Sequence, residues 1–182
     1  MISKMESSCD HREMQGQDIA LLLRLALPDG QSRLSKDIAA DLFLSPSEVS
    51  KSLKRSEQSG LIYMTDGSRR VNRTGLLEFL FHGLKYAFPP KRGSMARGIP
   101  TSYAAEPLKS KTLADSDPLP VWPFSQGTVR GIALEPLYKG APKAALINAN
   151  FYSLLALCDA LRSGSMRARN LAVELLKKEF DG

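Results

Sequence analysis

Short hydroxyl side chains and long cationic side chains share one stretch of the sequence, residues 45–55. A serine hydroxyl donates a hydrogen bond over a short reach, and a lysine or arginine neutralises an anion at a longer one. Donors of both lengths on one surface suit a ligand that combines hydrogen-bond acceptors with regularly spaced negative charges, as double-stranded DNA does. The side chains of this kind are Ser45, Ser47, Ser50, Lys51, Lys54 and Arg55.

A second cationic group comes shortly afterwards, just past Asp66-Gly67. An Asp-Gly pair favours a two-residue hairpin turn, because both residues tolerate a positive φ. A hairpin over residues 64–73 would carry its arginines near its tip, where they can contact a phosphate backbone or a minor groove. These arginines are Arg69, Arg70 and Arg73.

Residues 45–59 are predicted to form a helix with a well-defined start. The motif "SPSE", residues 45–48, is a complete capping box with a proline at the first helical position. Only Val49 and Leu53 form an apolar stripe, so most of the helix surface is exposed. We expect this helix to enter a major groove, with the serines near base edges and the lysines on phosphates. Arg55 can face either way.

Three further helices are predicted around this one. Residues 17–27 are apolar enough for a buried helix, and residues 34–42 repeat apolar positions at helical spacing with Ser35 as the N-cap. A third helix is predicted over residues 76–88, where a proline pair follows. Together these elements are expected to make a compact domain over residues 17–88.

The rest of the chain is expected to form three less compact segments. Residues 1–16 are a polar, patternless leader. Residues 89–147 hold most of the prolines and are predicted to be an extended segment anchored by Trp122, with one short strand at "TVRGIALEPL". Residues 148–182 are predicted to be a helical hairpin that serves packing or dimerisation.

One run at the start of the proline-rich part carries cations without any acid. It reads "KYAFPPKRGSMARG" and holds Lys85, Lys91, Arg92 and Arg97. One interpretation is an arm that contacts phosphates or an acidic partner. The other is a solvated linker, and the residues alone leave both open.

The two motifs described first carry a resemblance to a known family. Residues 17 to about 88 resemble the winged helix-turn-helix of MarR-like bacterial transcriptional regulators, on "LSKDIAADLFLSPSEVSKSLKRSEQSGLI" and "DGSRRVNRTG". The resemblance implies a second helix in the major groove, a wing beside it and homodimers on paired half-sites. This chain departs from ordinary MarR-like proteins, because it lacks a long N-terminal dimerisation helix and its proline-rich middle has no counterpart there.

Composition narrows the expected function further. The net charge of +6 and the isoelectric point near 9.4 favour a polyanionic partner. Cys9 and Cys158 fit neither a disulfide framework nor a zinc site, and the sequence holds no nucleophile–base set or phosphate loop. We therefore expect no enzyme activity, no metal and no cofactor. Without a signal core or a membrane-spanning run, a cytoplasmic protein is expected.

The expected fold class is mainly α with a minor α+β component: a winged helix-turn-helix domain with a small β-hairpin wing, a proline-rich extended segment and a C-terminal αα-hairpin. The expected function is sequence-specific regulation of transcription by a homodimer on double-stranded DNA. The alternative is an antitoxin-like protein-interaction module that binds a partner protein from a neighbouring gene through residues 89–182, since some winged-helix proteins of comparable layout are antitoxins.

Overall fold

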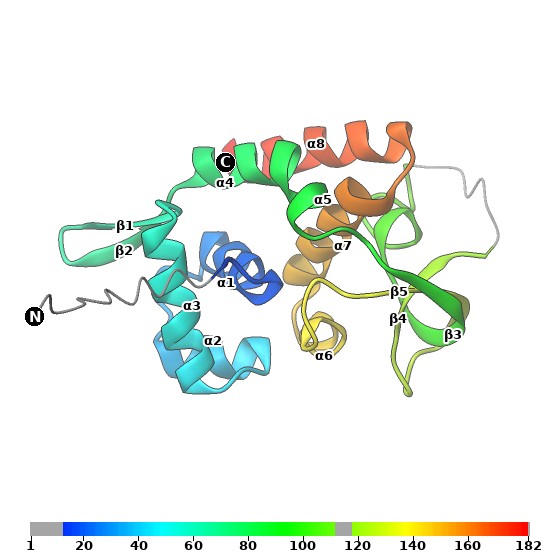
Figure 1. Cartoon of the computed structure of the whole chain (residues 1–182), viewed down its shortest axis with the longest axis horizontal. Helices are drawn as coiled ribbons and strands as arrows, with labels where there is room; N and C mark the ends of the chain where they lie inside the picture. Colours follow the sequence, from blue (N-terminus) through cyan, green and yellow to red (C-terminus); the bar gives the residue numbers. More distant parts are fainter. Residues whose placement is uncertain (1–12, 112–117, 182) are drawn as a thin grey trace, which may run out of the picture.

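The computed structural model of the chain describes residues 13–111 and 118–181, so most of the predicted leader, residues 1–12, lies outside the described part. Three helices come first: α1 (Gly16–Ala26), α2 (Ser35–Leu42) and α3 (Pro46–Gln58). An antiparallel hairpin follows, made of β1 (Ile62–Thr65) and β2 (Ser68–Val71). Figure 1 shows this hairpin projecting from one end of the molecule.

Helix α1 lies at the centre of this part because it is apolar on nearly all sides. Every residue from Asp18 to Ala26 is buried, which is typical of a helix enclosed by its neighbours. Helices α2 and α3 pack against it with the same short apolar stripes that their sequences predict. The helix predicted over residues 17–27 is confirmed, whereas Ser35 is the first residue of α2 and not its cap.

A longer helical segment continues from the hairpin. It consists of α4 (Arg73–Glu78), the π-helical turn η1 (Phe79–Gly83) and α5 (Leu84–Ala87). Asn72 caps this segment, because its side-chain oxygen accepts a hydrogen bond of 3.0 Å from the backbone N–H of Gly75. The helix predicted over residues 76–88 is therefore present and starts one turn earlier than expected.

The middle of the chain forms a small closed sheet. Its strands are β3 (Arg92–Pro100), β4 (Pro120–Pro123) and β5 (Val129–Leu134), and each pairs with both others. The pairs that involve β3 are antiparallel, and β4 and β5 are parallel. Glycine permits this closure, because a Cβ at Gly98 would collide with the carbonyl oxygen of Trp122 and one at Gly131 with that of Leu119.

The last part of the chain is helical again. After the short 3-10 turn η2 (Ser102–Ala104) and the sheet come α6 (Ala141–Ile147), α7 (Ala149–Ser163) and α8 (Met166–Asp181). Residues 154–162 of α7 are buried without interruption, so α7 is the C-terminal counterpart of α1. Buried residues of both halves belong to one hydrophobic core.

A buried carboxylate joins α7 to the sheet. The Nε1–H of Trp122 and the hydroxyl of Thr101 donate to one oxygen of Asp159, over 2.6 and 2.7 Å. Arg162 donates to the other oxygen over 2.7 Å. The prediction that Trp122 anchors its segment on a helix is confirmed.

The structure corrects the expected fold class. With 54% helix and 17% strand and two separate sheets in the described residues, the chain has an α+β fold and is not a mainly α winged helix. Residues 89–147 were expected to be an extended segment because they are rich in proline. Pro100, Pro120 and Pro123 lie at the ends of their strands, where a missing N–H removes little of the ladder, so proline density did not exclude a sheet.

Candidate nucleic-acid interface

The start of α3 is fixed by a network of short hydrogen bonds around Ser45. The Glu48 carboxylate accepts from the Ser45 backbone N–H and from its hydroxyl, both over 2.8 Å. The same hydroxyl oxygen accepts from the Glu48 N–H over 3.2 Å. These bonds to Ser45 hold the pKa of Glu48 below its ordinary value. Since the only hydroxyl proton of Ser45 is used here, Ser45 orients the helix and is removed from the predicted base contacts.

The inward face of α3 contains a buried ion pair that the apolar stripe did not reveal. The guanidinium of Arg55 donates two hydrogen bonds, of 2.7 and 2.6 Å, to the carboxylate of Asp18 on α1. The Ser52 hydroxyl donates to the same carboxylate over 2.6 Å. Arg55 is 4% exposed, so it is not available to a phosphate and that prediction is corrected. The physical reason is that a carboxylate inside an apolar helix requires a buried cation.

The outward face of α3 carries polar side chains that form no side-chain hydrogen bond or ion pair within the described part of the chain. Ser47, Ser50, Lys51 and Lys54 are exposed. Neither lysine forms an ion pair with any carboxylate in residues 13–111 and 118–181. Ser47, Lys51 and Lys54 fall at positions i, i+4 and i+7, so they follow one line along the helix. This line provides a hydroxyl near the N-terminus of the helix and two cations further along.

The β1–β2 hairpin has the turn that its sequence predicts. Asp66 and Gly67 both have a positive φ, 50° and 72°, as a type I′ turn requires. Arg70 is exposed and lies opposite Tyr63 across the ladder. Arg69 is also exposed but pairs with Glu57 of α3 over 3.4 Å. An exposed pair of this kind contributes little stability and separates readily, so both arginines can reach a ligand.

Arg73, the third arginine predicted on the hairpin, belongs instead to α4. Its guanidinium donates to the carbonyl oxygens of Ala26 and Phe180, over 2.9 and 3.0 Å, and lies over the Phe180 ring. It therefore joins the last turn of α1 to the last turn of α8. Carbonyl oxygens at helix C-termini lack intrahelical donors and attract cations, which explains this position. The prediction that Arg73 contacts phosphates is therefore wrong, because its guanidinium holds two helix ends together.

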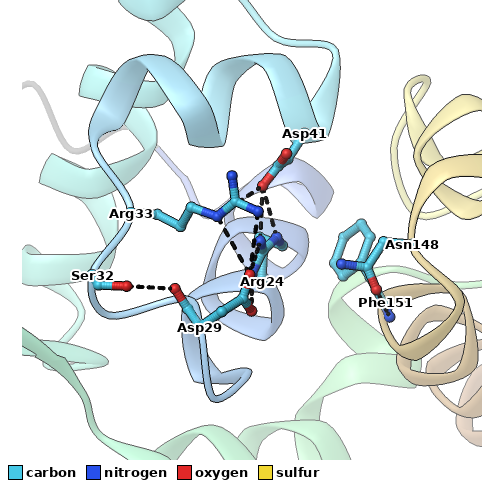
Figure 2. A network of polar contacts seen from close by, with 7 residues as sticks. All are labelled: Arg24, Asp29, Ser32, Arg33, Asp41, Asn148 and Phe151. Atoms are coloured by element: carbon cyan, nitrogen blue, oxygen red, sulfur yellow. Dashed lines mark hydrogen bonds and ion pairs between the residues drawn. The ribbon is translucent and has the colours of Figure 1, made fainter.

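The loop between α1 and α2 is held by an ionic network that sequence reasoning missed. Figure 2 shows Arg24 between Asp29 and Asp41, with Arg33 beside them. The Arg24 guanidinium is 1% exposed and donates to both carboxylates over 2.7 to 2.9 Å. Hydrogen bonding from Arg24 keeps the pKa of Asp29 below its ordinary value. Because the network ties α1 to α2, it helps to fix the base on which α3 rests.

A hollow of about 360 Å³ lies between this loop and the hairpin. Its floor is apolar, with Leu25, Ile38 and Leu53, and Arg33 and Arg70 are among the residues of its rim. No group of three or more His, Cys, Asp or Glu side chains in the described part of the chain is placed to hold a metal ion. The chemical groups that α3 and the hairpin present to a ligand are hydrogen-bond donors and positive charges.

Comparison with known proteins adds no family assignment. No protein-family model matches the chain, and neither a curated protein nor a solved structure matches it. The resemblance to MarR-like regulators therefore stays a prediction from the residues. None of the helices described here combines the length and the hydrophobicity that crossing a bilayer requires.

Proposed function

We propose that this chain is a sequence-specific DNA-binding regulator of bacterial transcription that acts in the cytoplasm. The observation that carries the proposal is the division of α3 into two faces. The inward face is held by the Asp18–Arg55 pair, and the outward face presents hydroxyls and lysines that form no ion pair among the described residues. A helix held on one side and free on the other is what insertion into a major groove requires.

The side chains on the outward face divide into two roles. An α-helix with its side chains is about 10–12 Å across and the major groove is about 12 Å wide, so one helix fills it. Ser47 and Ser50 lie nearest the N-terminus of α3 and are proposed to contact base edges. Lys51 and Lys54 reach further and are proposed to neutralise phosphates.

The hairpin is proposed to contact the backbone or minor groove beside the helix. Arg70 forms no ion pair with the described residues, and Arg69 becomes available when its exposed pair with Glu57 separates. We further propose that the chain acts as a homodimer on an inverted repeat. A dimer doubles the number of base contacts, and its two-fold axis matches two half-sites about one helical turn, or a multiple of it, apart.

The test is a fluorescence anisotropy titration with two duplexes of equal length. One comes from the region upstream of the protein's own gene, and the other has the same composition in shuffled order. Specific binding predicts a preference of about 10³-fold or more for the first duplex at the same salt concentration. Equal affinity for the two duplexes would refute sequence specificity. The control for substitutions of α3 lysines such as Lys51→Gln is Arg167→Gln, which removes an exposed cation at the start of α8.

A second candidate function rests on a different surface. Leu146 and Ile147, at the end of α6, are 62% and 60% exposed, and adjacent large apolar residues in water are typical of a protein contact. This favours the partner-protein alternative, in which residues 89–182 bind the product of a neighbouring gene. Co-expression of the two proteins tests it: Leu146→Asp/Ile147→Asp should abolish copurification, and retained copurification would exclude this surface.

A further inference from the structure

Two arginines face each other across the β3–β5 ladder. The register places Arg97 of β3 directly opposite Arg130 of β5, and both are exposed. Directly opposed residues of an antiparallel pair have Cβ atoms about 4.5–5.5 Å apart and lie on the same face of the sheet. Like charges in this arrangement destabilise the ladder. Such a pair therefore calls for an explanation other than stability.

Within residues 13–111 and 118–181, no carboxylate pairs with either of the two charges. Neither Arg97 nor Arg130 forms an ion pair within residues 13–111 and 118–181, and neither β3 nor β5 contains an acidic residue. The nearest acid in sequence, Glu135 just after β5, pairs with Lys91 over 3.5 Å. As far as the described residues go, both guanidiniums are thus available to bind an external anion.

The other cations of the same run are occupied, which distinguishes Arg97 from them. Arg92 donates to the carbonyl oxygen of Ser163 over 3.1 Å. Lys85 lies 4.6 Å from the centre of the Tyr86 ring. Of the four cations in "KYAFPPKRGSMARG", Arg97 is the one without a partner in the described residues, and folding adds Arg130 to it.

The backbone beneath the pair is held in place. The backbone N–H of Phe124 donates to the carbonyl oxygen of Arg97 over 3.0 Å. The next turn brings Gly127 so close to Gly98 that no Cβ would fit between them. With β3 and β5 also paired in a closed sheet, the two guanidiniums project from a fixed base, which reduces the entropy lost when they bind a ligand.

Two guanidinium groups on directly opposed residues offer more donors than a single neutral ligand can use, and they suit the oxygens of a phosphate. Each guanidinium has a planar set of donors that can bind a phosphate through two hydrogen bonds. Exposed Ser125 and Gln126 lie in the adjoining turn and add neutral donors. The neighbouring cross-strand pair, Met95 and Ile132, is uncharged and does not compete for the anion.

We propose that Arg97 and Arg130 form a second site for backbone phosphates of the nucleic acid. This proposal rests on the proposed function, because it assumes that the DNA bound by α3 also contacts Arg97 and Arg130. Figure 1 places the β1–β2 hairpin and the β3–β4–β5 sheet at opposite ends of the molecule, so the bound duplex extends beyond α3 or bends toward the sheet. The site adds affinity and no sequence preference, since phosphates are the same at every step.

The test measures DNA affinity of the full chain against salt concentration, with a duplex of about 40 base pairs, roughly four helical turns. Arg97→Gln/Arg130→Gln removes two phosphate contacts. The slope of log K against log salt should therefore fall by about 1.8, and the affinity at about 0.1 M salt should fall roughly ten- to a hundredfold. Lys109→Gln/Arg167→Gln removes two exposed cations that belong to neither proposed site and should leave the slope unchanged.

Two further measurements separate a lost contact from a lost fold. Because the substitution removes opposed like charges, the thermal midpoint should stay the same or rise. Arg97→Lys/Arg130→Lys should keep the salt slope but bind less tightly, since an ammonium cannot form the paired hydrogen bonds. In the wild-type chain, the Nε–Hε NMR signals of Arg97 and Arg130 should shift on addition of the duplex, and that of buried Arg24 should not.

An unchanged salt slope in Arg97→Gln/Arg130→Gln, or Nε–Hε signals that do not move at saturating duplex, would overturn the second site. Signals that shift with poly-glutamate and not with DNA would also overturn it, in favour of an acidic polypeptide. The outcome is independent of α3, because Lys51→Gln/Lys54→Gln tests that helix separately. If the lysine variant binds normally, the proposed role of α3 fails, while a lower salt slope in the arginine variant still supports a phosphate site on the sheet.

Discussion

Helix α3 and the β3–β5 ladder both present exposed cations that form no ion pair in the described structure, but their arrangements differ. Along α3, hydroxyls and lysines of different reach follow a helical line that fits a groove. On β3 and β5, two identical guanidiniums stand side by side, beside an uncharged cross-strand pair. The first surface has the side chains to distinguish bases, whereas the second has charge and forked donors alone. A basic patch therefore indicates a polyanion, and the variety of its side chains indicates whether sequence is recognised.

The two surfaces are supported in the same way. Behind α3, the carboxylate of Asp18 gathers Ser52 and Arg55. Behind the sheet, the carboxylate of Asp159 gathers Thr101, Trp122 and Arg162. In each half a buried acid on a central helix orients the element that carries the exposed cations. Substitutions at the two buried carboxylates and their donors test the supports, and substitutions of the exposed side chains test how the two surfaces differ.

The largest effect is expected from Asp18→Ala. It leaves the guanidinium of Arg55 buried without its carboxylate, which should reduce the free energy of unfolding by about 3–5 kcal/mol. Urea denaturation followed by circular dichroism measures this. Asp18→Leu/Arg55→Leu, which removes both charges, should be less harmful than the single change, and a single change without effect would contradict the buried pair.

A smaller loss of stability is expected when a hydrogen bond to Asp159, behind the sheet, is removed. Trp122→Phe removes one of the donors to Asp159, which should cost about 1–3 kcal/mol in the same denaturation experiment. Thr101→Val removes a second donor to the same oxygen and is the matched variant. Equal stability of wild type and Trp122→Phe would show that the sheet does not depend on this hydrogen bond.

Next in size is the loss of phosphate contacts on α3. Lys51→Gln/Lys54→Gln should lower the slope of log K against log salt by about 1.8 and weaken binding roughly ten- to a hundredfold, for specific and shuffled duplexes alike. Anisotropy titrations over a salt series provide the measurement. Weaker binding to the specific duplex alone would assign the lysines to bases instead.

A serine substitution on α3 tests whether this surface, unlike the sheet, distinguishes DNA sequences. Ser47→Ala should reduce the preference for the specific duplex by roughly five- to tenfold, the equivalent of about 1 kcal/mol for one hydrogen bond. Binding to the shuffled duplex should not change. Competition titration of the two duplexes measures the ratio. Arg97→Gln/Arg130→Gln is the opposite case, because both affinities should fall and their ratio should remain.

The smallest effect concerns pH. The folded-state pKa of Glu48 lies below its ordinary value of 4.5 because it accepts two hydrogen bonds from Ser45, and that of Asp29 is lowered by Arg24. Groups with lowered pKa stabilise the fold at neutral pH and lose this contribution as pH falls through the acidic range. The thermal midpoint should thus decrease slightly between pH 7 and about pH 3. In Glu48→Gln the decrease should be smaller, and an identical pH profile would contradict the capping contribution.

Local signals predicted local structure well. "SPSE" begins a helix at residue 46 and Asp66-Gly67 turns a hairpin, because each signal acts through bonds between residues a few positions apart. The same reasoning failed for the β3–β4–β5 sheet, in which Gly98 contacts Trp122 across a long separation in sequence. Pairings of that range depend on which surfaces remain after the helices pack, and a proline count does not reveal them.

The candidate site was predictable to the extent that its side chains have no partners. Ser47, Ser50, Lys51 and Lys54 are exposed, as the narrow apolar stripe of α3 predicts. Arg55 was misplaced because its partner lies on another helix. A signal for it was present nevertheless: Asp18 stands in an otherwise apolar helix, and a carboxylate there requires a cation from elsewhere in the chain.

The sequence by itself determined the boundaries of α3, the turn of the hairpin and the excess of positive charge, since caps, turns and net charge depend on nearby residues or on totals. The tertiary structure decided which of the arginines face solvent. Arg55 and Arg73 bind a carboxylate and helix-end carbonyl oxygens inside the fold, and Arg97 and Arg130 lie opposite each other without an acidic partner among the described residues. A cationic side chain turns toward the acceptor that lies close to it, and only the folded chain determines which acceptors are close.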